Sequence, residues 1–477
     1  MKLNELLNGL EILKSNVDME MEIGNVAYDS RKVVPGGMFV AITGFATDGN
    51  RFIPMALEKG AAVVVTAVEP KEDVPFVLVS SDRKALARIG ANFFGHPARA
   101  MTMVGVTGTN GKTSSTLLLK HILETVQGAK VGLIGTMENL IGHEVVPTER
   151  TTPESFELQA LFARMRDAGC RYVVMEVSSH AIALDRVDTV RYDVAAFTNL
   201  TEDHLDFHET MENYCDVKAQ LFTRCGRAVM NCDDPWFARM RTGVTCPVLT
   251  TSVKDAAGLY ARDVEMRSDG VSFTAVYGPK TARVALGIPG KFTVYNALTV
   301  LGMALQLGIS LEAAAEALAS AKGVKGRVEV VPTPGKPYTN LIDYAHSPDG
   351  LENVLSSVRD FCKGRLIAVF GCGGDRDRTK RPIMGRIGVE LADLAVITSD
   401  NPRTEEPGAI IRDIMEGVGD APNAHVVENR REAIHYAMDI AQKDDIIVLA
   451  GKGHETYQEI CGVKHHMDER ELVAEHL

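Results

Sequence analysis

The run of residues 107–113, Thr-Gly-Thr-Asn-Gly-Lys-Thr, carries the strongest chemical signal in the sequence. It follows an apolar stretch, residues 101–106, and precedes a stretch with helical periodicity, residues 114–126. A strand that passes through a glycine-bearing turn into a helix directs backbone N–H groups at phosphates. Lys112 would then reach the terminal phosphates, and the Thr113 hydroxyl would bind Mg²⁺. The glycine spacing departs from the standard phosphate-binding loop, so we predict a variant loop that binds ATP or GTP.

A second group of residues could hold a metal ion. Glu176 ends the predicted strand of residues 172–177. His204 and His208 follow the predicted strand of residues 194–198. Strand ends of α/β sheets face the ligand crevice, and carboxylate oxygens suit Mg²⁺ while a histidine can serve a second ion. The sequence therefore predicts a metal site here, with an acidic loop bearing histidines at helical spacing as the alternative.

Three loops in the last third of the chain carry charges of both signs, and each follows a predicted strand: residues 371–378, 400–403 and 451–455. Arg376 and Arg403 could hold carboxylates bidentately, and Glu455 could hold an ammonium group. These loops predict a site for a small zwitterion, and structural salt bridges are the alternative. The first loop lacks the G-x-G-x-x-G spacing, which argues against a nicotinamide dinucleotide.

The elements that must position these residues form three α/β domains. The N-terminal one, residues 1–97, is small, with predicted strands at residues 38–41, 61–65 and 76–79. The second, residues 98–327, alternates apolar strands with helical stretches such as 156–168, which favours a mostly parallel sheet. Its later part predicts an antiparallel addition and a helical pair: residues 271–276, 282–288 and 297–321. The third domain, residues 328–477, resumes the alternation with strands at residues 340–343, 366–370, 394–398 and 446–450.

Composition limits the classes of partner. The 477 residues carry 51 Lys and Arg against 63 Asp and Glu, a net charge of −12, which offers no basic surface for nucleic acid or an anionic membrane. There is no apolar run of signal-peptide length near the start and no later window of about 18 apolar residues. The eight cysteines form no CxxC pair, which suits reduced thiols. We therefore expect a cytoplasmic protein, a monomer, that acts on small molecules without nucleic acid or membrane insertion.

Taken together, these segments resemble the Mur ligases, the ATP-dependent amide-forming enzymes of peptidoglycan precursor synthesis, along nearly the whole chain. The matching segments, besides residues 107–113, are 29–31, 151–153, 176–180, 199–208, 343–346 and 371–378. They look like the branch of the family that adds the third amino acid. The resemblance implies a UDP-binding N-terminal domain, a central P-loop-type ATPase domain and a Rossmann-like C-terminal domain for the incoming amino acid.

The resemblance also implies roles for individual residues. ATP would contact Gly108, Thr109, Asn110, Gly111, Lys112, Thr113, Ser114, Asn296 and Arg327. The UDP-muramoyl dipeptide would contact Ser30, Thr151, Thr152, Ser178 and Arg186. The amino acid would contact Arg376, Asp400, Asn401, Pro402, Arg403, Gly451 and Glu455. Magnesium would be held by Thr113, Glu176, His204 and Lys218, and the catalytic set would be Lys112, Lys218, His204 and Glu176.

Lys218 matches the lysine that this family carbamylates with CO₂, although composition alone predicts an ordinary surface lysine. Carbamylation would make it an anion that helps to ligate magnesium.

The implied reaction transfers the γ-phosphoryl group of ATP to the D-glutamate carboxylate of the muramoyl dipeptide, and an amine then displaces phosphate from the acyl phosphate. The Asp-Asn-Pro-Arg sequence at residues 400–403 is the version associated with meso-diaminopimelate. Its arginine suits the extra carboxylate that distinguishes diaminopimelate from lysine. The alternatives are the same ligase with L-lysine, a folylpolyglutamate synthetase-like ligase, a nucleotide-responsive binding protein and a nicotinamide dehydrogenase.

Overall fold

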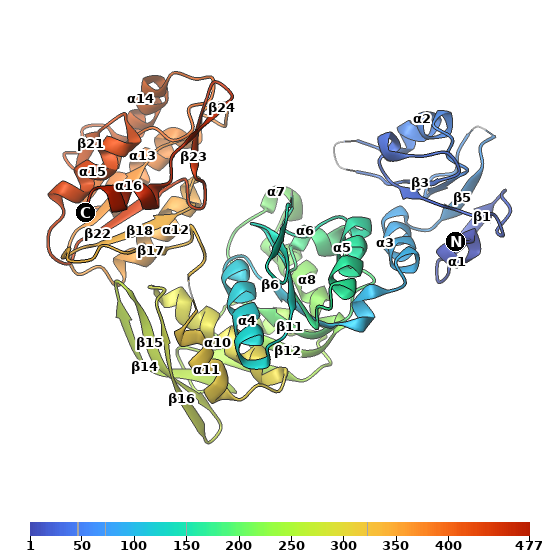
Figure 1. Cartoon of the computed structure of the whole chain (residues 1–477), viewed down its shortest axis with the longest axis horizontal. Helices are drawn as coiled ribbons and strands as arrows, with labels where there is room; N and C mark the ends of the chain where they lie inside the picture. The colour runs from blue at the N-terminus through green and yellow to red at the C-terminus, as the bar shows by residue number, and fades with distance from the viewer. Residues whose placement is uncertain (45–46, 72, 149, 322) are drawn as a thin grey trace. The chain divides into compact units, whose positions relative to one another are not determined.

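The computed structural model of the protein describes residues 1–44, 47–71, 73–148, 150–321 and 323–477. The helices and strands of the chain, drawn in Figure 1, belong to two compact units, residues 1–251 with 299–309, and residues 252–298 with 310–477. Each unit contains a mostly parallel sheet covered by helices, as the strand and helix alternation predicts.

The N-terminal part of the first unit is a five-stranded sheet in the order β1-β5-β4-β3-β2. Its strands are β1 (Ile12–Ser15), β2 (Val26–Ala27), β3 (Met38–Ala41), β4 (Val63–Thr66) and β5 (Phe76–Val79). The helices are α1 (Leu3–Leu6), α2 (Ile53–Glu58) and α3 (Asp82–Phe93). Met38 and Val40 face one core with α3, whereas Phe39 and Ala41 face a second core with α2. Successive side chains of a strand point to opposite faces, so β3 is buried on both.

The central sheet of the first unit has parallel strands in the order β13-β12-β11-β6-β10-β7. They are β6 (Thr102–Thr107), β7 (Val131–Ile134), β10 (Tyr172–Glu176), β11 (Tyr192–Phe197), β12 (Cys225–Asn231) and β13 (Val248–Ser252). The antiparallel strands β8 (Asn139–Ile141) and β9 (Glu144–Val146) follow β7. The helices are α4 (Lys112–Gln127), α5 (Ser155–Asp167), α6 (Ser179–Ala183), α7 (Leu205–His208), α8 (Met211–Ala219) and α9 (Phe237–Met240).

The second unit begins with an antiparallel meander of β14 (Leu259–Arg267), β15 (Gly270–Tyr277) and β16 (Lys280–Leu286). Two helices follow, α10 (Lys291–Gln306), whose residues from Thr299 on belong to the first unit, and α11 (Leu311–Ala319). The predicted antiparallel addition and helical pair are confirmed. The first helix begins before the predicted residue 297 because Val294 is also buried and extends the apolar face.

The C-terminal sheet has the order β17-β18-β22-β19-β20-β21 and is parallel except for β17. Its strands are β17 (Glu329–Val331), β18 (Thr339–Asp343), β19 (Leu366–Phe370), β20 (Leu394–Ile397), β21 (Ala424–Val426) and β22 (Ile446–Ala450). One core contains α12 (Pro348–Arg359), α13 (Lys380–Leu391) and α14 (Pro407–Val418). The other contains α15 (Arg430–Ile440) and α16 (Glu469–Glu475). A hairpin of β23 (Tyr457–Ile460) and β24 (Val463–His466) precedes α16.

The predicted α/β class with three domains is confirmed, and the strands at residues 38–41, 76–79, 366–370 and 446–450 have the predicted bounds. Within the described ranges, no helix has the length and apolar character needed to span a bilayer. The eight cysteines are free thiols.

Candidate active site

Four neighbouring parallel strands of the central sheet, in the order β11-β6-β10-β7, end at the same edge. The residues that follow them lie within hydrogen-bonding reach of one another across this edge. Parallel strands put their carboxyl ends on one side, which is why segments far apart in the sequence meet here.

The loop of residues 108–111 turns from β6 into α4 in a conformation that needs glycine. Gly108 has φ +144°, and a Cβ placed there would lie 1.9 Å from the Thr198 Oγ1 atom. Gly111, at φ +84°, precedes the first residue of α4. Asn199 braces the loop, because its carbonyl accepts from Thr109 N at 2.8 Å and its side-chain oxygen accepts from Asn110 N at 3.0 Å.

Lys112 and Lys218 meet beneath this loop. Lys112 Nζ donates to the carbonyl oxygens of Gly108 (2.9 Å) and Thr109 (2.7 Å), and Lys218 Nζ donates to that of Gly108 (2.9 Å). Lys218 is 1% exposed, so the composition-based expectation of a surface lysine is wrong. Its amine also lies 4.6 Å from the ring centroid of Tyr214. Burial, reinforced by the charge of Lys112, holds the pKa of Lys218 well below its ordinary value.

The Glu176 carboxylate is the acidic centre of this edge. Its Oε1 accepts from Thr113 Oγ1 and from the Thr136 backbone N, both at 2.9 Å, and its Oε2 accepts from Thr136 Oγ1 at 3.0 Å. The described residues contain no group of three or more His, Cys, Asp or Glu side chains arranged for a metal. Mg²⁺ at a nucleotide site needs only one or two protein oxygens, since phosphates and waters complete the octahedron. The Thr113 hydroxyl and the Glu176 carboxylate fit that requirement.

His204 immediately precedes α7, and its side chain is exposed, with two aromatic rings near it. Its ring lies edge-on to His180, with centroids 4.9 Å apart, and edge-on to Tyr214, at 6.3 Å. Tyr214 therefore links His204 with Lys218. His208, the other candidate ligand, is buried with its Nε2 2.9 Å from Ser179 Oγ, and burial lowers its pKa to about 4.

The residues expected to bind the muramoyl dipeptide adjoin Glu176, with one exception. Thr152 Oγ1 donates to the Glu176 carbonyl at 2.8 Å and accepts from Ser178 N at 3.2 Å. Arg186 donates to the Thr152 carbonyl at 3.2 Å and to Glu154 Oε2, also at 3.2 Å. Thr151 Oγ1 lies 3.0 Å from Thr136 Oγ1. The exception, Ser30, belongs to the N-terminal domain, where its Oγ lies 3.3 Å from Met55 Sδ.

The three charged loops of the C-terminal domain come together around Asn401. Its carbonyl accepts from Gly374 N at 2.9 Å, and its side chain donates to Glu455 Oε2 at 2.9 Å and accepts from Lys452 Nζ at 3.0 Å. Arg403 Nη1 donates to the Gly374 carbonyl at 2.8 Å. A Cβ on Gly451 would lie 2.7 Å from Asp400 Oδ2, and one on Gly374 would lie 1.9 Å from the Pro402 carbonyl oxygen. Glycine at these positions leaves room for the Asp400 carboxylate and for the Pro402 carbonyl oxygen.

Two residues expected near the nucleotide, Asn296 and Arg327, belong to the second unit. Asn296 is buried on α10, and the Arg327 guanidinium lies 5.6 Å from the ring centroid of Tyr344. Ser114 lies in the first turn of α4.

Comparison with known proteins places these features in a family. The family model described as the Mur ligase middle domain matches residues 106–304, the Mur ligase glutamate ligase domain matches 326–453, and the Mur ligase family catalytic domain matches 22–97. A protein of Clostridium botulinum called UDP-N-acetylmuramoyl-L-alanyl-D-glutamate–2,6-diaminopimelate ligase is 47% identical over 483 residues, which covers 100% of this chain and 99% of that protein. The chain belongs to the Mur ligase family.

Solved structures agree with this membership. A structure of a UDP-N-acetylmuramoyl-L-alanyl-D-glutamate–2,6-diaminopimelate ligase is 31% identical, with a TM-score of 0.75, and the match covers 100% of this chain and 98% of that one. The Thermotoga maritima MurF ligase in complex with ADP is 20% identical, with a TM-score of 0.60, over 95% of this chain and 96% of that one. The second likeness concerns the fold alone.

Several contacts of this Mur ligase were missed by the sequence analysis. Thr136 follows β7, and the rule that strand ends carry ligands would have found it had β7 been predicted. Lys452 lies in the predicted loop of residues 451–455, but nothing in the sequence indicated its bond to the Asn401 side chain.

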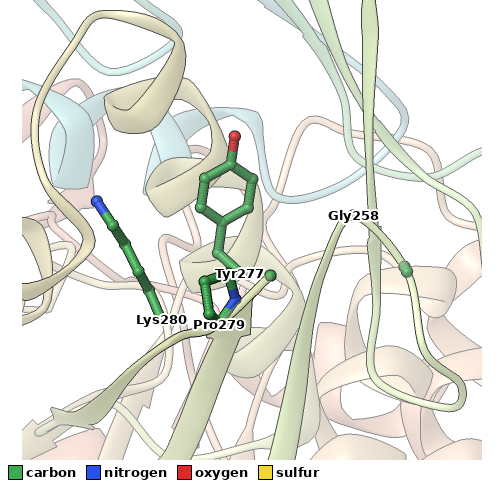
Figure 2. A pocket seen from close by; sticks show the side chains of 6 residues that line it. Gly258, Tyr277, Pro279 and Lys280 are labelled. Carbon is green, nitrogen blue, oxygen red and sulfur yellow. The ribbon is translucent and has the colours of Figure 1, made fainter.

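A hollow of about 520 Å³ in the Mur ligase lies elsewhere, at the β15–β16 turn (Figure 2). It is lined by Ala257, Gly258, Tyr277, Gly278, Pro279 and Lys280. These residues include none of the predicted site residues, so this hollow is not the candidate active site.

Proposed function

We propose that this Mur ligase joins meso-diaminopimelate to the D-glutamate of UDP-N-acetylmuramoyl-L-alanyl-D-glutamate, with conversion of ATP to ADP and phosphate, in peptidoglycan precursor synthesis. The observation that carries the proposal is the convergence of the three charged loops on Asn401, which gathers Arg403 and Glu455 beside the glycine-rich loop of residues 371–378. The full-length similarity to diaminopimelate ligases supports the same substrates.

The first half of the reaction belongs to the central domain. The loop of residues 108–113 holds the ATP phosphates through backbone N–H groups and the Lys112 amine. A carboxylate oxygen of D-glutamate attacks the γ-phosphorus, the bond from that phosphorus to the β,γ-bridging oxygen breaks, and ADP leaves with the electron pair. The resulting acyl phosphate has an activated carbonyl carbon. Lys112 offsets the charge that two anions bring together, which is the main task in phosphoryl transfer.

The second half forms the amide bond. A neutral amine of diaminopimelate attacks the acyl carbonyl carbon, a tetrahedral intermediate collapses, and phosphate leaves with the electrons of the C–O bond. The nitrogen loses one proton in this step, and the departing phosphate takes it up, so that inorganic phosphate leaves as HPO₄²⁻. Arg376 and Arg403 would hold the distal carboxylate and Glu455 the distal ammonium group. In the structure Glu455 Oε2 also lies 3.2 Å from Lys452 Nζ, so its charge is partly offset before substrate arrives.

Thr113, Glu176, His204 and a carbamylated Lys218 would hold magnesium, which would offset the negative charge of the phosphates. Carbamylation requires a neutral amine, and the depressed pKa of Lys218 favours that form. The carbamate would put an anion beside Lys112, where the unmodified side chain puts a second amine.

The arginine at residue 403 favours diaminopimelate over the L-lysine alternative, because lysine lacks the second carboxylate. A folylpolyglutamate-type ligase would leave both the N-terminal domain and the loop of residues 400–403 without a role.

Since ATP and the UDP-linked precursor are cytoplasmic metabolites, we place the reaction in the cytoplasm, and we expect a monomer in light scattering. We also propose that the three domains comprise residues 1–97, 98–327 and 328–477.

Mass spectrometry of the product tests this function. Protein incubated with ATP, Mg²⁺, the UDP-muramoyl dipeptide and diaminopimelate should yield a product whose mass is the sum of the two substrates less one water. The same mixture with L-lysine in place of diaminopimelate is the control. Formation of only the lysine adduct would replace the proposed acceptor, and absence of either adduct would contradict the ligase assignment.

A further inference from the structure

One fully buried arginine of the C-terminal domain has no place in the reaction described above. The Arg381 side chain, in α13, is 0% exposed. Its two terminal nitrogens form a fork on Glu405, with Nη1 to Oε2 at 3.0 Å and Nη2 to Oε1 at 2.8 Å. Nη1 also donates to Asp413 Oδ2 at 2.8 Å, and Nη2 donates to the Gly373 carbonyl at 3.3 Å.

These contacts join the two loops that carry the arginines expected to bind diaminopimelate. Gly373 belongs to the loop of residues 371–378, and Glu405 follows the loop of residues 400–403. Glu405 Oε1 also accepts from Asp375 N at 2.6 Å. The Asp375 carboxylate in turn accepts from Thr404 Oγ1 at 2.6 Å and from Thr404 N at 3.2 Å. Hydrogen bonds therefore connect the two loops in both directions, and Arg381 donates those to Gly373 and Glu405.

Gly373 lies between the two arginines. A Cβ built on Gly373 would lie 2.9 Å from Arg403 Nη1 and 3.8 Å from Arg376 Cγ. The next carbonyl along the chain, that of Gly374, accepts from Arg403 Nη1 at 2.8 Å. A shift of the Gly373 backbone would consequently displace the Arg403 guanidinium relative to the aliphatic stem of Arg376.

Burying a guanidinium is costly, and an ion pair with no access to water is weak evidence for stability by itself. An arginine is better explained here by the geometry it imposes on Glu405, whose two oxygens it binds. Bidentate recognition of a carboxylate tolerates displacements of only about 0.5 Å. Lysine, a single point charge, could satisfy either carboxylate but could not span Glu405, Asp413 and the Gly373 carbonyl at once.

We propose that Arg381 is a positioning residue that sets amino-acid selectivity by fixing the separation of Arg376 and Arg403. It rests on the proposed function, since it takes diaminopimelate as the acceptor. Arg381 itself is buried beneath the loops and acts through them, so it governs how tightly the distal carboxylate is held, while the ATP and muramoyl sites are left unaltered.

The test compares Arg381→Lys with Arg412→Lys. Arg412 is the control, because it is an exposed arginine outside the three loops and is paired with Glu406 at 3.3 Å. ADP release should show that Arg381→Lys raises the KM for diaminopimelate about 10- to 100-fold. The KM values for ATP and for UDP-muramoyl dipeptide should stay within about twofold, and Arg412→Lys should resemble the unmodified protein.

Selectivity separates positioning from general damage. With L-lysine as a poor alternative acceptor, Arg381→Lys should lower the ratio of kcat/KM for diaminopimelate to kcat/KM for lysine. An equal fall for both acceptors, a rise in all three KM values, or no change would overturn the proposal. If Arg381→Lys does not fold, Glu405→Gln weakens the same fork and should shift the ratio in the same direction. Failure of the unmodified protein to release ADP with diaminopimelate would instead contradict the proposed function.

Discussion

The amines of Lys112 and Lys218 both lie 2.9 Å from a single acceptor, the carbonyl oxygen of Gly108. Two cations on one oxygen repel each other, and the buried partner, Lys218, has the depressed pKa. Conversion of Lys218 into a carbamate anion in the working enzyme would replace this repulsion with attraction. Lys112 would then have a negative neighbour at its side as it meets the ATP phosphates.

Removal of the Lys112 amine should stop phosphoryl transfer without unfolding the protein. We expect Lys112→Ala to lower kcat for ADP release by about 100-fold or more, the scale of a lost transition-state charge contact. Circular dichroism and the thermal unfolding temperature should be close to those of the unmodified protein. ADP release near the original rate would contradict the assignment of the nucleotide loop.

Carbamylation of Lys218 can be observed without turnover. Protein equilibrated with ¹³C-bicarbonate should show a carbamate carbon resonance that is missing from Lys218→Ala. The variant should be inactive, and short carboxylic acids such as acetate should partly restore ADP release by occupying the vacated space. A spectrum without the resonance in the unmodified protein, or a complete failure of rescue, would count against the carbamate.

Thr136 holds both oxygens of Glu176, through its backbone N at 2.9 Å and its hydroxyl at 3.0 Å. Thr136→Val keeps the shape and the backbone contact but loses the hydroxyl. Because groups that orient a metal ligand typically contribute about 10- to 100-fold, the Mg²⁺ concentration for half-maximal ADP release should rise by about tenfold. Direct Mn²⁺ binding measured by electron paramagnetic resonance should weaken in parallel. Unchanged metal dependence would show that Glu176 does not hold the ion.

Arg403→Ala should lose preference for diaminopimelate over L-lysine by about 1 to 3 kcal/mol, or about 5- to 150-fold in the ratio of kcat/KM values. Arg412→Ala is the control, since Arg412 is an exposed arginine paired with Glu406 at 3.3 Å. Retention of full selectivity by Arg403→Ala would move recognition of the distal carboxylate to other residues.

Glu405 offers a prediction about pH. Its bonds from Arg381 and Asp375 N lower the pKa of the carboxyl group to about 2, below the ordinary value of 4.5. A carboxyl group whose pKa is lower in the folded state contributes stability that is fully present above the unfolded value and is lost as pH falls towards the folded value. The difference in unfolding temperature between the unmodified protein and Glu405→Gln should therefore be constant above pH 5 and shrink as the pH falls from about 4.5 to 3. A difference that grows on acidification would contradict this.

The sequence predicted most reliably the strands that are buried on both faces. β19 and β22 are unbroken apolar runs, and their predicted bounds match the structure. β14 was missed because its middle is charged and exposed, so neither alternation nor an apolar run marks it. β12 was also missed, because its first three residues, Cys-Gly-Arg, are not buried and do not form an apolar run.

The site was predictable where strand ends carried unusual residues. Thr113 and Glu176 were expected to act together, and in the structure the Thr113 hydroxyl donates to Glu176 Oε1 at 2.9 Å. The burial of Lys218 and Arg381 could not be foreseen, because a lysine or arginine on a helix has the same sequence appearance whether it faces solvent or the core. Lys218 bonds to the Gly108 carbonyl and Arg381 to the Glu405 carboxylate, and both of these partners are more than 20 residues away along the chain.

The most direct test of the central claim is ADP release by the purified protein with ATP, Mg²⁺ and UDP-N-acetylmuramoyl-L-alanyl-D-glutamate. Three reactions are compared, with meso-diaminopimelate, with L-lysine and with no amino acid. We predict release that depends on diaminopimelate. Release with lysine alone would keep the ligase but contradict the role of Arg403, and equal rates in all three reactions would contradict the proposed function.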